Sequence, residues 1–358
     1  MTTYKPLAAD DRVSTKTLLH EAIPITGTIV SGTYTDLNIQ NFSHGMFQSV
    51  YDYPYLSSSA NHIFDITFGT SPVGLVTTVQ TAKKDNIYNQ MAQVLMGYDK
   101  NGTIQTFDED GNLTGGTKID NTIFVSFSRL LVKDEIKKGS FEMEIGATVA
   151  YATPFTDSIK IVDYGAATSY KVNSPAGEYG ILYVTNSVNT PLNAAITGPT
   201  DQPCGLIYYQ AGVAVINPAI LMAGSGSGDG GFLTTAVEYD ATPGTTIAAS
   251  IQDQFITASA DNLRNRIKNI QFNNTIELNS TVYFCRAKHN EFNYSSNPTY
   301  LNDSQIRVKT NSTDVPISYI TSIGLYSADN QLLAVGKFSE PVRKDSNIEL
   351  TFRARLDY

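Results

Sequence analysis

The sequence predicts a mainly β protein: an antiparallel β-sandwich or meander core with one or two short helices and an extended N-terminal arm. Apolar and polar residues alternate without a break over residues 347–358, and a half-buried strand requires this period of two. Strand patterns at residues 317–326 and 332–338 precede it after short links, which favour antiparallel pairing. Charged residues make up only 16% of a chain that contains 21 Tyr and 16 Phe, as suits a protein rich in sheet and contact surface.

Residues 1–60 are predicted to form the arm, followed by a β-rich core over residues 61–358. The first segment is too polar to bury enough apolar surface to offset its ordering entropy. Its clustered aromatic residues are candidate assembly contacts: Phe47, Tyr51, Tyr53 and Tyr55. We expect them to dock either on the core of the same chain or on a neighbouring subunit.

One strong helix is predicted over residues 81–96. Its apolar residues fall at helical spacing, and Gly97 is suited to end it. The face expected to be buried carries Ile87, Met91, Val94 and Leu95. Residues 245–258 indicate a weaker helix, and residues 133–138 and 261–268 indicate helical turns.

The remaining apolar runs predict short strands separated by turns. They lie at residues 63–68, 103–107, 122–128, 141–145, 179–184, 205–209, 213–216, 270–272, 275–278 and 281–286. Residues 148–260 either belong to the same core or form a subdomain inserted into it. Residues 204–222 carry no charge, but turn residues interrupt them, so two strands explain them better than a membrane span.

Composition narrows the classes of partner. The net charge of −9 argues against a nucleic-acid groove, which needs clustered Lys and Arg. Cys204 and Cys285 are too few for a disulfide framework, so both are expected to be buried free thiols. The first residues lack a secretory pattern, which is consistent with synthesis in a cytoplasm.

The search for catalytic and cofactor motifs predicts none. The glycine-rich residues 224–231 lack the Lys-Ser/Thr pair of a phosphate loop. No G-x-S-x-G turn is present to anchor a hydrolytic triad. Glu142 and Glu144 could serve a glycosidase as paired carboxylates, but they lie on the polar face of a strand, and a solvated face explains them better.

No metal site is expected either. Asp108, Asp110 and Asn112 imitate the start of a calcium loop, but Leu113 and Ile119 stand where that loop needs Gly and Glu. A polar hairpin tip explains these residues better. The four histidines are scattered, with no two at the spacing of metal ligands: His20, His44, His62 and His289.

Residues 323–336, IGLYSADNQLLAVG, resemble a signature of bacteriophage tail-collar and tail-fibre proteins. The chain departs from it at Ser322, Ser327 and Asn330, where that family usually has an acid, Asp and Gly. Four further stretches resemble structural proteins of large contractile-tailed phages: residues 87–99, 128–140, 174–183 and 283–287. The broader resemblance extends from about residue 61 to the C-terminus.

This resemblance implies a virion component made in the host cytoplasm. Two functions remain open. The first is a non-enzymatic structural subunit of the tail, neck or baseplate that binds other virion proteins and further copies of itself, with no cofactor, nucleic acid or membrane. The alternative is a receptor- or glycan-binding tail module, in which exposed Tyr and Asn side chains contact a host sugar. Aromatic residues also enrich protein–protein interfaces, so composition does not separate the two.

Overall fold

The computed structural model confirms a mainly β protein and divides the chain into two compact units. Unit 1 consists of Met1–Leu18 and Glu277–Tyr358, and unit 2 of Leu19–Ile276. The division therefore differs from the predicted one, which placed a boundary at residue 60. The structure describes residues 4–19, 36–51, 54–71, 78–113, 115–127, 135–186, 190–194, 196–198, 200, 202–224, 231–295, 301–302, 305–306, 311 and 313–357.

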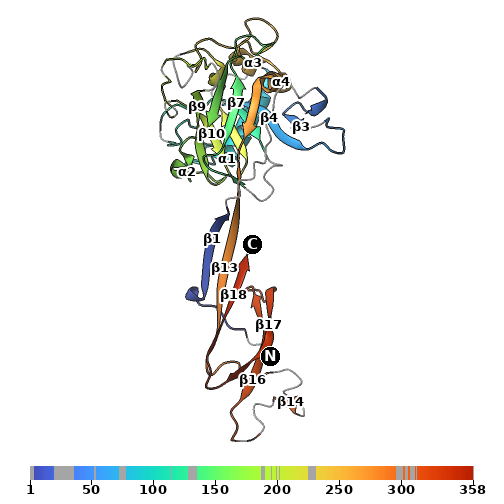
Figure 1. Cartoon of the computed structure of the whole chain (residues 1–358), viewed down its shortest axis with the longest axis vertical. Helices are drawn as coiled ribbons and strands as arrows, with labels where there is room; N and C mark the ends of the chain where they lie inside the picture. The colour runs from blue at the N-terminus through green and yellow to red at the C-terminus, as the bar shows by residue number, and fades with distance from the viewer. Residues whose placement is uncertain are drawn as a thin grey trace. The chain divides into compact units, whose positions relative to one another are not determined.

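Unit 2 is built on a ten-stranded sheet in which every neighbouring pair is antiparallel (Figure 1). In spatial order its strands are β12 (Ile267–Gln271), β7 (Glu142–Gly146), β8 (Ser158–Val162), β9 (Tyr179–Asn186), β10 (Pro203–Tyr208), β11 (Val213–Ile216), β5 (Asn121–Ser126), β4 (His62–Thr70), β3 (Gln48–Tyr51) and β2 (Ile39–Asn41). Residues 148–260 thus supply four consecutive strands of this sheet, β8 to β11. The alternative that they form an inserted subdomain is therefore wrong. Strands β10 and β11 lie inside the sheet and are buried, which accounts for the uncharged run over residues 204–222.

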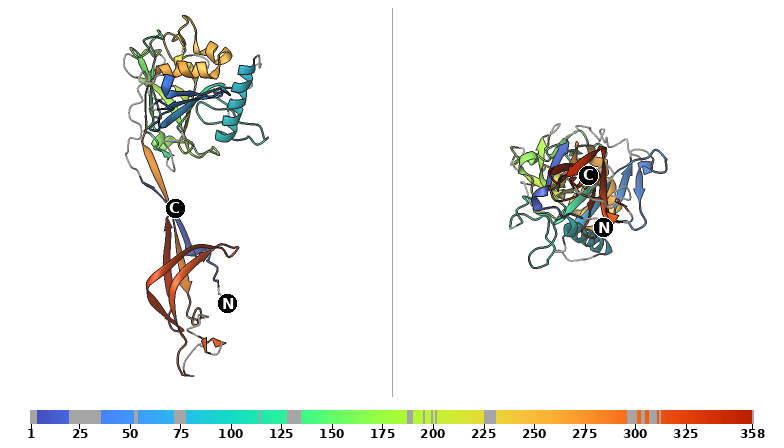
Figure 2. Two further views of the ribbon diagram at one scale, coloured as in Figure 1. Left: turned by 90° about the vertical axis from the view of Figure 1, so that its right-hand side faces the viewer. Right: turned by 90° about the horizontal axis from the view of Figure 1, so that it is seen from below.

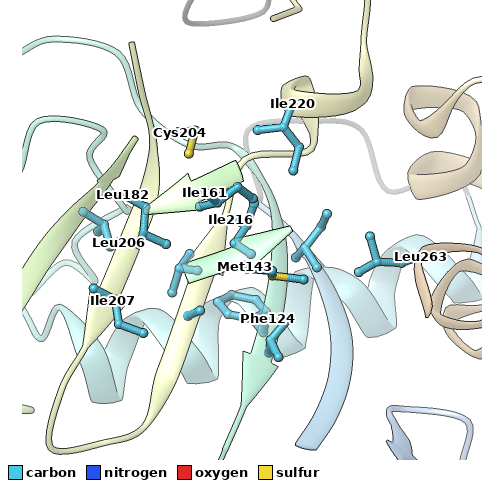
Figure 3. Packing of buried hydrophobic residues seen from close by; sticks show 14 of the residues in the cluster. Phe124, Met143, Ile161, Leu182, Cys204, Leu206, Ile207, Ile216, Ile220 and Leu263 are labelled. Atoms are coloured by element: carbon cyan, nitrogen blue, oxygen red, sulfur yellow. The ribbon is translucent and has the colours of Figure 1, made fainter. Parts of the chain in front are cut away.

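Helices cover this sheet and enclose the core. α1 (Val79–Leu95) packs on β4, and α4 (Ile256–Arg266) packs on β3 and β4 (Figure 2). α3 (Ile247–Asp253) contacts both helices. Figure 3 shows core side chains of several strands with Leu263 of α4 beside them. The short elements are η1 (Ala9–Asp11), η2 (Asp36–Asn38), α2 (Ala166–Ser169), η3 (Pro218–Leu221) and β6 (Glu135–Ile136).

The prediction for α1 is confirmed in position and is wrong in one detail. Thr78 caps its start by accepting a hydrogen bond from the Thr81 amide, and Gly97, with φ +79°, follows its end. Leu95 is buried, but Val94 is 65% exposed. Ala92, which carries little weight in an apolar pattern, is fully buried instead. Val94 lies two residues after Ala92 and therefore points to nearly the opposite side of the helix.

Other local predictions need correction. The weak helix at 245–258 and the turn at 261–268 are the separate helices α3 and α4. Glu135 and Ile136 form strand β6, which pairs with β13, and not a helical turn. Residues 103–107 contribute only an isolated bridge between Ile104 and Tyr98. In each case a tertiary partner decides the local state of a short, weakly patterned segment.

Unit 1 contains the sheet β1–β13–β18, with bounds Arg12–Leu19, Asn274–Ala287 and Leu350–Asp357, and a hairpin of β16 (Ile317–Tyr326) and β17 (Leu332–Asp345). The pair β14 (Leu301–Asn302) and β15 (Gln305–Ile306) completes it. The hairpin was predicted, and Asn330 takes the left-handed φ of +60° that its turn requires. The predicted third meander strand, β18, pairs with β13 and not with β17 (Figure 1).

The prediction of an extended N-terminal arm is wrong for those described parts of residues 1–60 that form strands. β2 and β3 lie at one edge of the unit 2 sheet, with Val50 fully buried, while β1 pairs with β13. β2 and β3 contain three and four residues, which is too short for a period of two to stand out in the sequence.

Candidate assembly surface at the sheet edge

The edge of the unit 2 sheet formed by β2, β3 and their flanking loops carries two groups of ring side chains. We call this surface the aromatic edge; it comprises Phe42, His44, Phe47, Tyr51, Tyr55 and His62. Because β2 is the last strand of its sheet, its outer side has no strand partner among the described residues. An unpaired edge of this kind can bind another chain.

The first group lies on the turn between β2 and β3. The rings of Phe42 and His44 stack with centroids 5.3 Å apart, and the Phe47 ring lies 4.8 Å from Phe42 and 5.1 Å from His44. Gly45, with φ +61°, allows the turn, and the Met46 amide donates to His44 Nδ1. His44 is exposed while Phe42 and Phe47 are half-buried, so the group presents a ring surface at the end of the hairpin.

The second group follows from the pairing of β3 with β4. Tyr51 stands opposite His62 in register, with ring centroids 5.4 Å apart, and lies 6.2 Å from Tyr55. The Tyr51 hydroxyl donates to Gln40 Oε1 at 2.9 Å, which fixes the ring beside β2. The loop that follows leaves Tyr55 36% exposed and Leu56 85% exposed. Apolar side chains therefore reach solvent next to a polar, hydrogen-bonded strand.

Three of the four predicted contact residues lie on the aromatic edge. Phe47 belongs to the first group, and Tyr51 and Tyr55 belong to the second. Tyr53 lies outside the described residues. Sequence reasoning missed Phe42, His44 and His62. His62 could have been identified only from the β3–β4 register, in which it stands opposite Tyr51. The pairing of the two strands sets this register, and the sequence pattern does not show it.

A serine, a histidine and an aspartate meet beside the second group, but not in the order of a hydrolytic triad. Ser49 Oγ donates to Asp65 Oδ1 at 2.5 Å, and His62 Nε2 lies 2.7 Å from the same oxygen. A triad needs the histidine between the serine and the acid, so that the imidazole can take the hydroxyl proton. Here the carboxylate separates the two, and the arrangement holds β3 and β4 together.

The predicted polar hairpin tip at residues 108–112 uses its own carboxylates. Asp108 accepts from the amides of Asp110 and Gly111 and forms an ion pair with Lys118. Asp110 accepts from the amide and the side chain of Asn112. The Lys118 ammonium thus supplies the positive charge at this loop. Among the described residues no group of three His, Cys, Asp or Glu side chains could hold a metal ion.

The paired glutamates of β7 are tied into the sheet. Glu142 pairs with Lys160 at 2.7 Å, and Glu144 accepts from Lys268 at 2.8 Å and from Ser158 at 2.7 Å. Glu144 is buried, so the expected solvated face is wrong for that residue. Both carboxylates serve cross-strand pairs.

Buried charged groups in unit 2 contact the backbone. Arg266 is fully buried and donates to the carbonyl oxygens of Thr148 at 2.9 Å and of Gly146 at 3.3 Å, and burial lowers its pKa to about 10. Lys84 is also fully buried and donates to carbonyls at the end of α3, including that of Gln254 at 2.9 Å. These cations satisfy carbonyls that would otherwise lie unpaired in the core.

Asp163 is the buried carboxylate of the same unit. It accepts hydrogen bonds from the amides of Gly139 at 2.7 Å and Phe141 at 3.0 Å, and from the Tyr209 hydroxyl at 3.1 Å. Burial raises the pKa of Asp163 to about 6, although these hydrogen bonds favour its ionised form. Its donors all belong to the protein, so it holds the loop before β7 in place.

Both cysteines are free thiols, but the prediction that both are buried is correct only for Cys204. Cys204 is buried, which raises its pKa, and Cys285 is only half-buried. None of the helices in the described ranges has the length and apolar character of a membrane span. The glycine-rich residues 225–230 lie outside those ranges.

No family model, no curated protein and no solved structure matches this chain. A role for the aromatic edge therefore has to be inferred from its geometry alone.

Proposed function

We propose that this protein is a non-enzymatic structural subunit of a tailed-phage virion, placed in the tail, neck or baseplate, and that it acts through protein–protein contacts. It would be made in the host cytoplasm and bind other virion proteins and further copies of itself. The virion assignment rests on the resemblance of residues 323–336 to tail-collar and tail-fibre proteins. The observation that supports an assembly role is the aromatic edge.

The aromatic edge has the composition of a protein interface. Interface centres are enriched in aromatic side chains, which bury large areas, and their rims are polar. Tyr51, Tyr55 and Leu56 form such a centre beside the amide side chain of Gln40, to which the Tyr51 hydroxyl donates. The unpaired edge of β2 can add main-chain hydrogen bonds to a partner strand.

A glycan-binding role is the second candidate. It is favoured by the half-buried Tyr51 and exposed Tyr55 rings beside the Gln40 amide, because sugars offer hydroxyl groups to amides and C–H faces to rings. However, Gln48 already donates to Asn41 at 3.1 Å and to Asp261 at 2.7 Å, and Gln40 already accepts from Tyr51. These bonds commit the amides to the fold, which favours the assembly role.

The proposal is tested by locating the chain in the particles whose genome encodes it. We expect cryo-electron microscopy to place it in the tail, neck or baseplate. A complementation test then asks whether the aromatic edge is needed: the double variant Tyr55→Ser, Leu56→Ser should be absent from purified particles while remaining folded. Tyr164→Ser, Val172→Ser, which removes exposed apolar side chains elsewhere in unit 2, is the matched control and should incorporate normally.

Two results would overturn the proposal. One is purified particles that lack the chain. The other is normal incorporation of the edge variant, which would remove the aromatic edge from the assembly contacts. Binding of the isolated protein to a host-derived glycan, lost in the edge variant and kept in the control, would favour the second candidate instead.

A further inference from the structure

Unit 1 has almost no apolar core. It contains about 100 residues, yet its only buried apolar side chains in the described ranges are Val282 and Ala287. Folding costs roughly 1–2 kcal/mol of backbone entropy per residue, and a unit of this size normally offsets that cost by burying many apolar side chains. The strands of unit 1 therefore need apolar cover that the chain itself does not supply.

The uncovered surface is concentrated on the β16–β17 hairpin. We call it the hairpin patch; its exposed large apolar residues are Tyr319, Tyr326, Leu332, Leu333 and Val335. The two strands form a sheet of their own. A two-stranded sheet is at best marginally stable in water without a packed face.

Other residues of unit 1 cover this hairpin only in part. Phe338 of β17 packs against Phe352 of β18, with ring centroids 4.7 Å apart. Val335 lies three residues before Phe338 and so points to the opposite face, and Leu333 lies at a register shift near the end of the strand pair; they are 61% and 69% exposed. Within unit 1 the Tyr4 ring packs against Tyr326 of the hairpin patch, with centroids 4.8 Å apart, while Leu333 and Val335 remain exposed. Unit 1 therefore covers the hairpin patch only in part.

The β1–β13–β18 sheet has an open face as well. A hollow of about 300 Å³ lies on it, lined by Val13, Thr15, Ser280, Val282, Phe284, Arg353 and Arg355. Phe284 is in register with Arg353, and Cys285 with Phe352, so this face is the one turned away from β17. Valine and phenylalanine side chains and the apolar stems of two arginines thus form a second apolar surface.

Charge indicates which partner fits these surfaces. Unit 1 holds 12 basic and 11 acidic residues, a net charge of +1, whereas the whole chain carries −9, which leaves −10 on unit 2. Copies that meet through unit 1 bring near-neutral, apolar surfaces together, while contact through unit 2 would bring like charges together. A foreign partner selected by charge would need a strongly charged face, and unit 1 as a whole is near neutral.

We infer that unit 1 is completed by unit 1 of further copies of this chain, with the hairpin patch in the contact. An apolar patch is self-complementary, because each copy offers the same surface to the other. Association supplies the buried apolar area that one copy lacks. The inference names the self-association partner of the proposed structural subunit, but it needs only the isolated protein and not a virion.

Sedimentation velocity of the purified full chain tests this directly. We expect one defined oligomer at micromolar concentration. The double variant Leu333→Ser, Val335→Ser should raise its dissociation constant by at least about tenfold, since two apolar side chains leave the contact. Val79→Ser, Val94→Ser on α1 is the matched control, because these side chains are 73% and 65% exposed, and it should leave the dissociation constant unchanged.

Backbone hydrogen exchange supplies a second readout. In the Leu333→Ser, Val335→Ser variant the amides of β16 and β17 should exchange at least tenfold faster, while those of β10 and β11 stay protected. A monomeric wild-type chain, an aggregate without defined stoichiometry, or an equal effect of both double variants would each overturn the inference. A monomer found in purified particles would contradict the self-association but leave the structural role standing. An oligomer absent from particles would do the reverse.

Discussion

The two units differ in what lies behind their strands. In unit 2 the buried apolar side chains between Val50 and Phe272 form one cluster. Both the ten-stranded sheet and the helices contribute side chains to it. In unit 1 alternation is just as regular, yet the apolar positions of β18 are only half-buried. Its most buried long side chain is Lys344, which donates to Asn293 Oδ1 at 2.7 Å. Alternation of apolar and polar residues therefore indicates a strand and identifies its apolar face. It does not show that other residues cover that face.

The largest expected effect compares one phenylalanine in each unit. Phe124→Ala removes a buried ring that packs against Phe107 with centroids 5.6 Å apart, and it should lower the free energy of unfolding of unit 2 by about 3–5 kcal/mol. Phe352→Ala removes a half-buried ring and should leave the unit 2 transition unchanged. Denaturant unfolding followed by circular dichroism measures both. Equal shifts of one shared transition would contradict the separation of the units.

A second comparison lies within α1. Leu95→Ala should cost about 2–5 kcal/mol, because the side chain is 2% exposed and its removal leaves a cavity. Val94→Ala, at the next position but exposed, should change the free energy of unfolding by less than about 0.5 kcal/mol. Chemical denaturation of the two variants side by side measures the difference. A larger cost at Val94 would reverse the assigned face of the helix.

A third comparison concerns acids and pH. The pKa of Asp163 is raised to about 6 by burial, so the folded state binds more protons than the unfolded state between about pH 4 and 6. The stability contributed by this group therefore falls as pH rises through that window. The stability difference between wild type and Asp163→Asn should be larger at pH 4 than at pH 7, by about 3 kcal/mol.

Asp357 of unit 1 is the matched control for this measurement. Hydrogen bonds from Ser280 and Arg355 lower its pKa, so its contribution has the opposite sign and is lost as pH falls through the lowered pKa. The difference between wild type and Asp357→Asn should therefore shrink, not grow, at acid pH. The same pH trend at both positions would show that burial does not distinguish the two acids.

The smallest expected effect compares two glycines. Gly97→Ala places a side chain at φ +79° and brings its Cβ within 3.2 Å of Pro175, so it should cost about 1 kcal/mol or slightly more. Gly336→Ala in β17 has open space around the new methyl group and no positive φ, and should be neutral or stabilising. Thermal unfolding of both variants checks this. Destabilisation by Gly336→Ala would mean that the side of the hairpin that carries Phe338 is packed more closely than this structure shows.

Part of the candidate surface was predictable, because aromatic residues that cluster in sequence stay close in space. Phe47, Tyr51 and Tyr55 belong to this class. His62 joins them only because β4 pairs with β3 in a register that places it opposite Tyr51. Phe42 is five residues before Phe47, and the turn at Gly45 brings their rings together. Neither relation has a sequence period.

The sequence alone determined the local elements whose signals are strong: the α1 helix with its glycine end, the β16–β17 hairpin with its turn, and the alternation of β18. Each depends on backbone geometry within a few residues, which side-chain type controls directly. Only the tertiary structure decided that β18 pairs with β13, that residues 39–51 extend the unit 2 sheet, and that Arg266 is buried among carbonyls. These outcomes depend on partners far away in the chain, and a strand pattern specifies a face without specifying what pairs with its edge or covers that face.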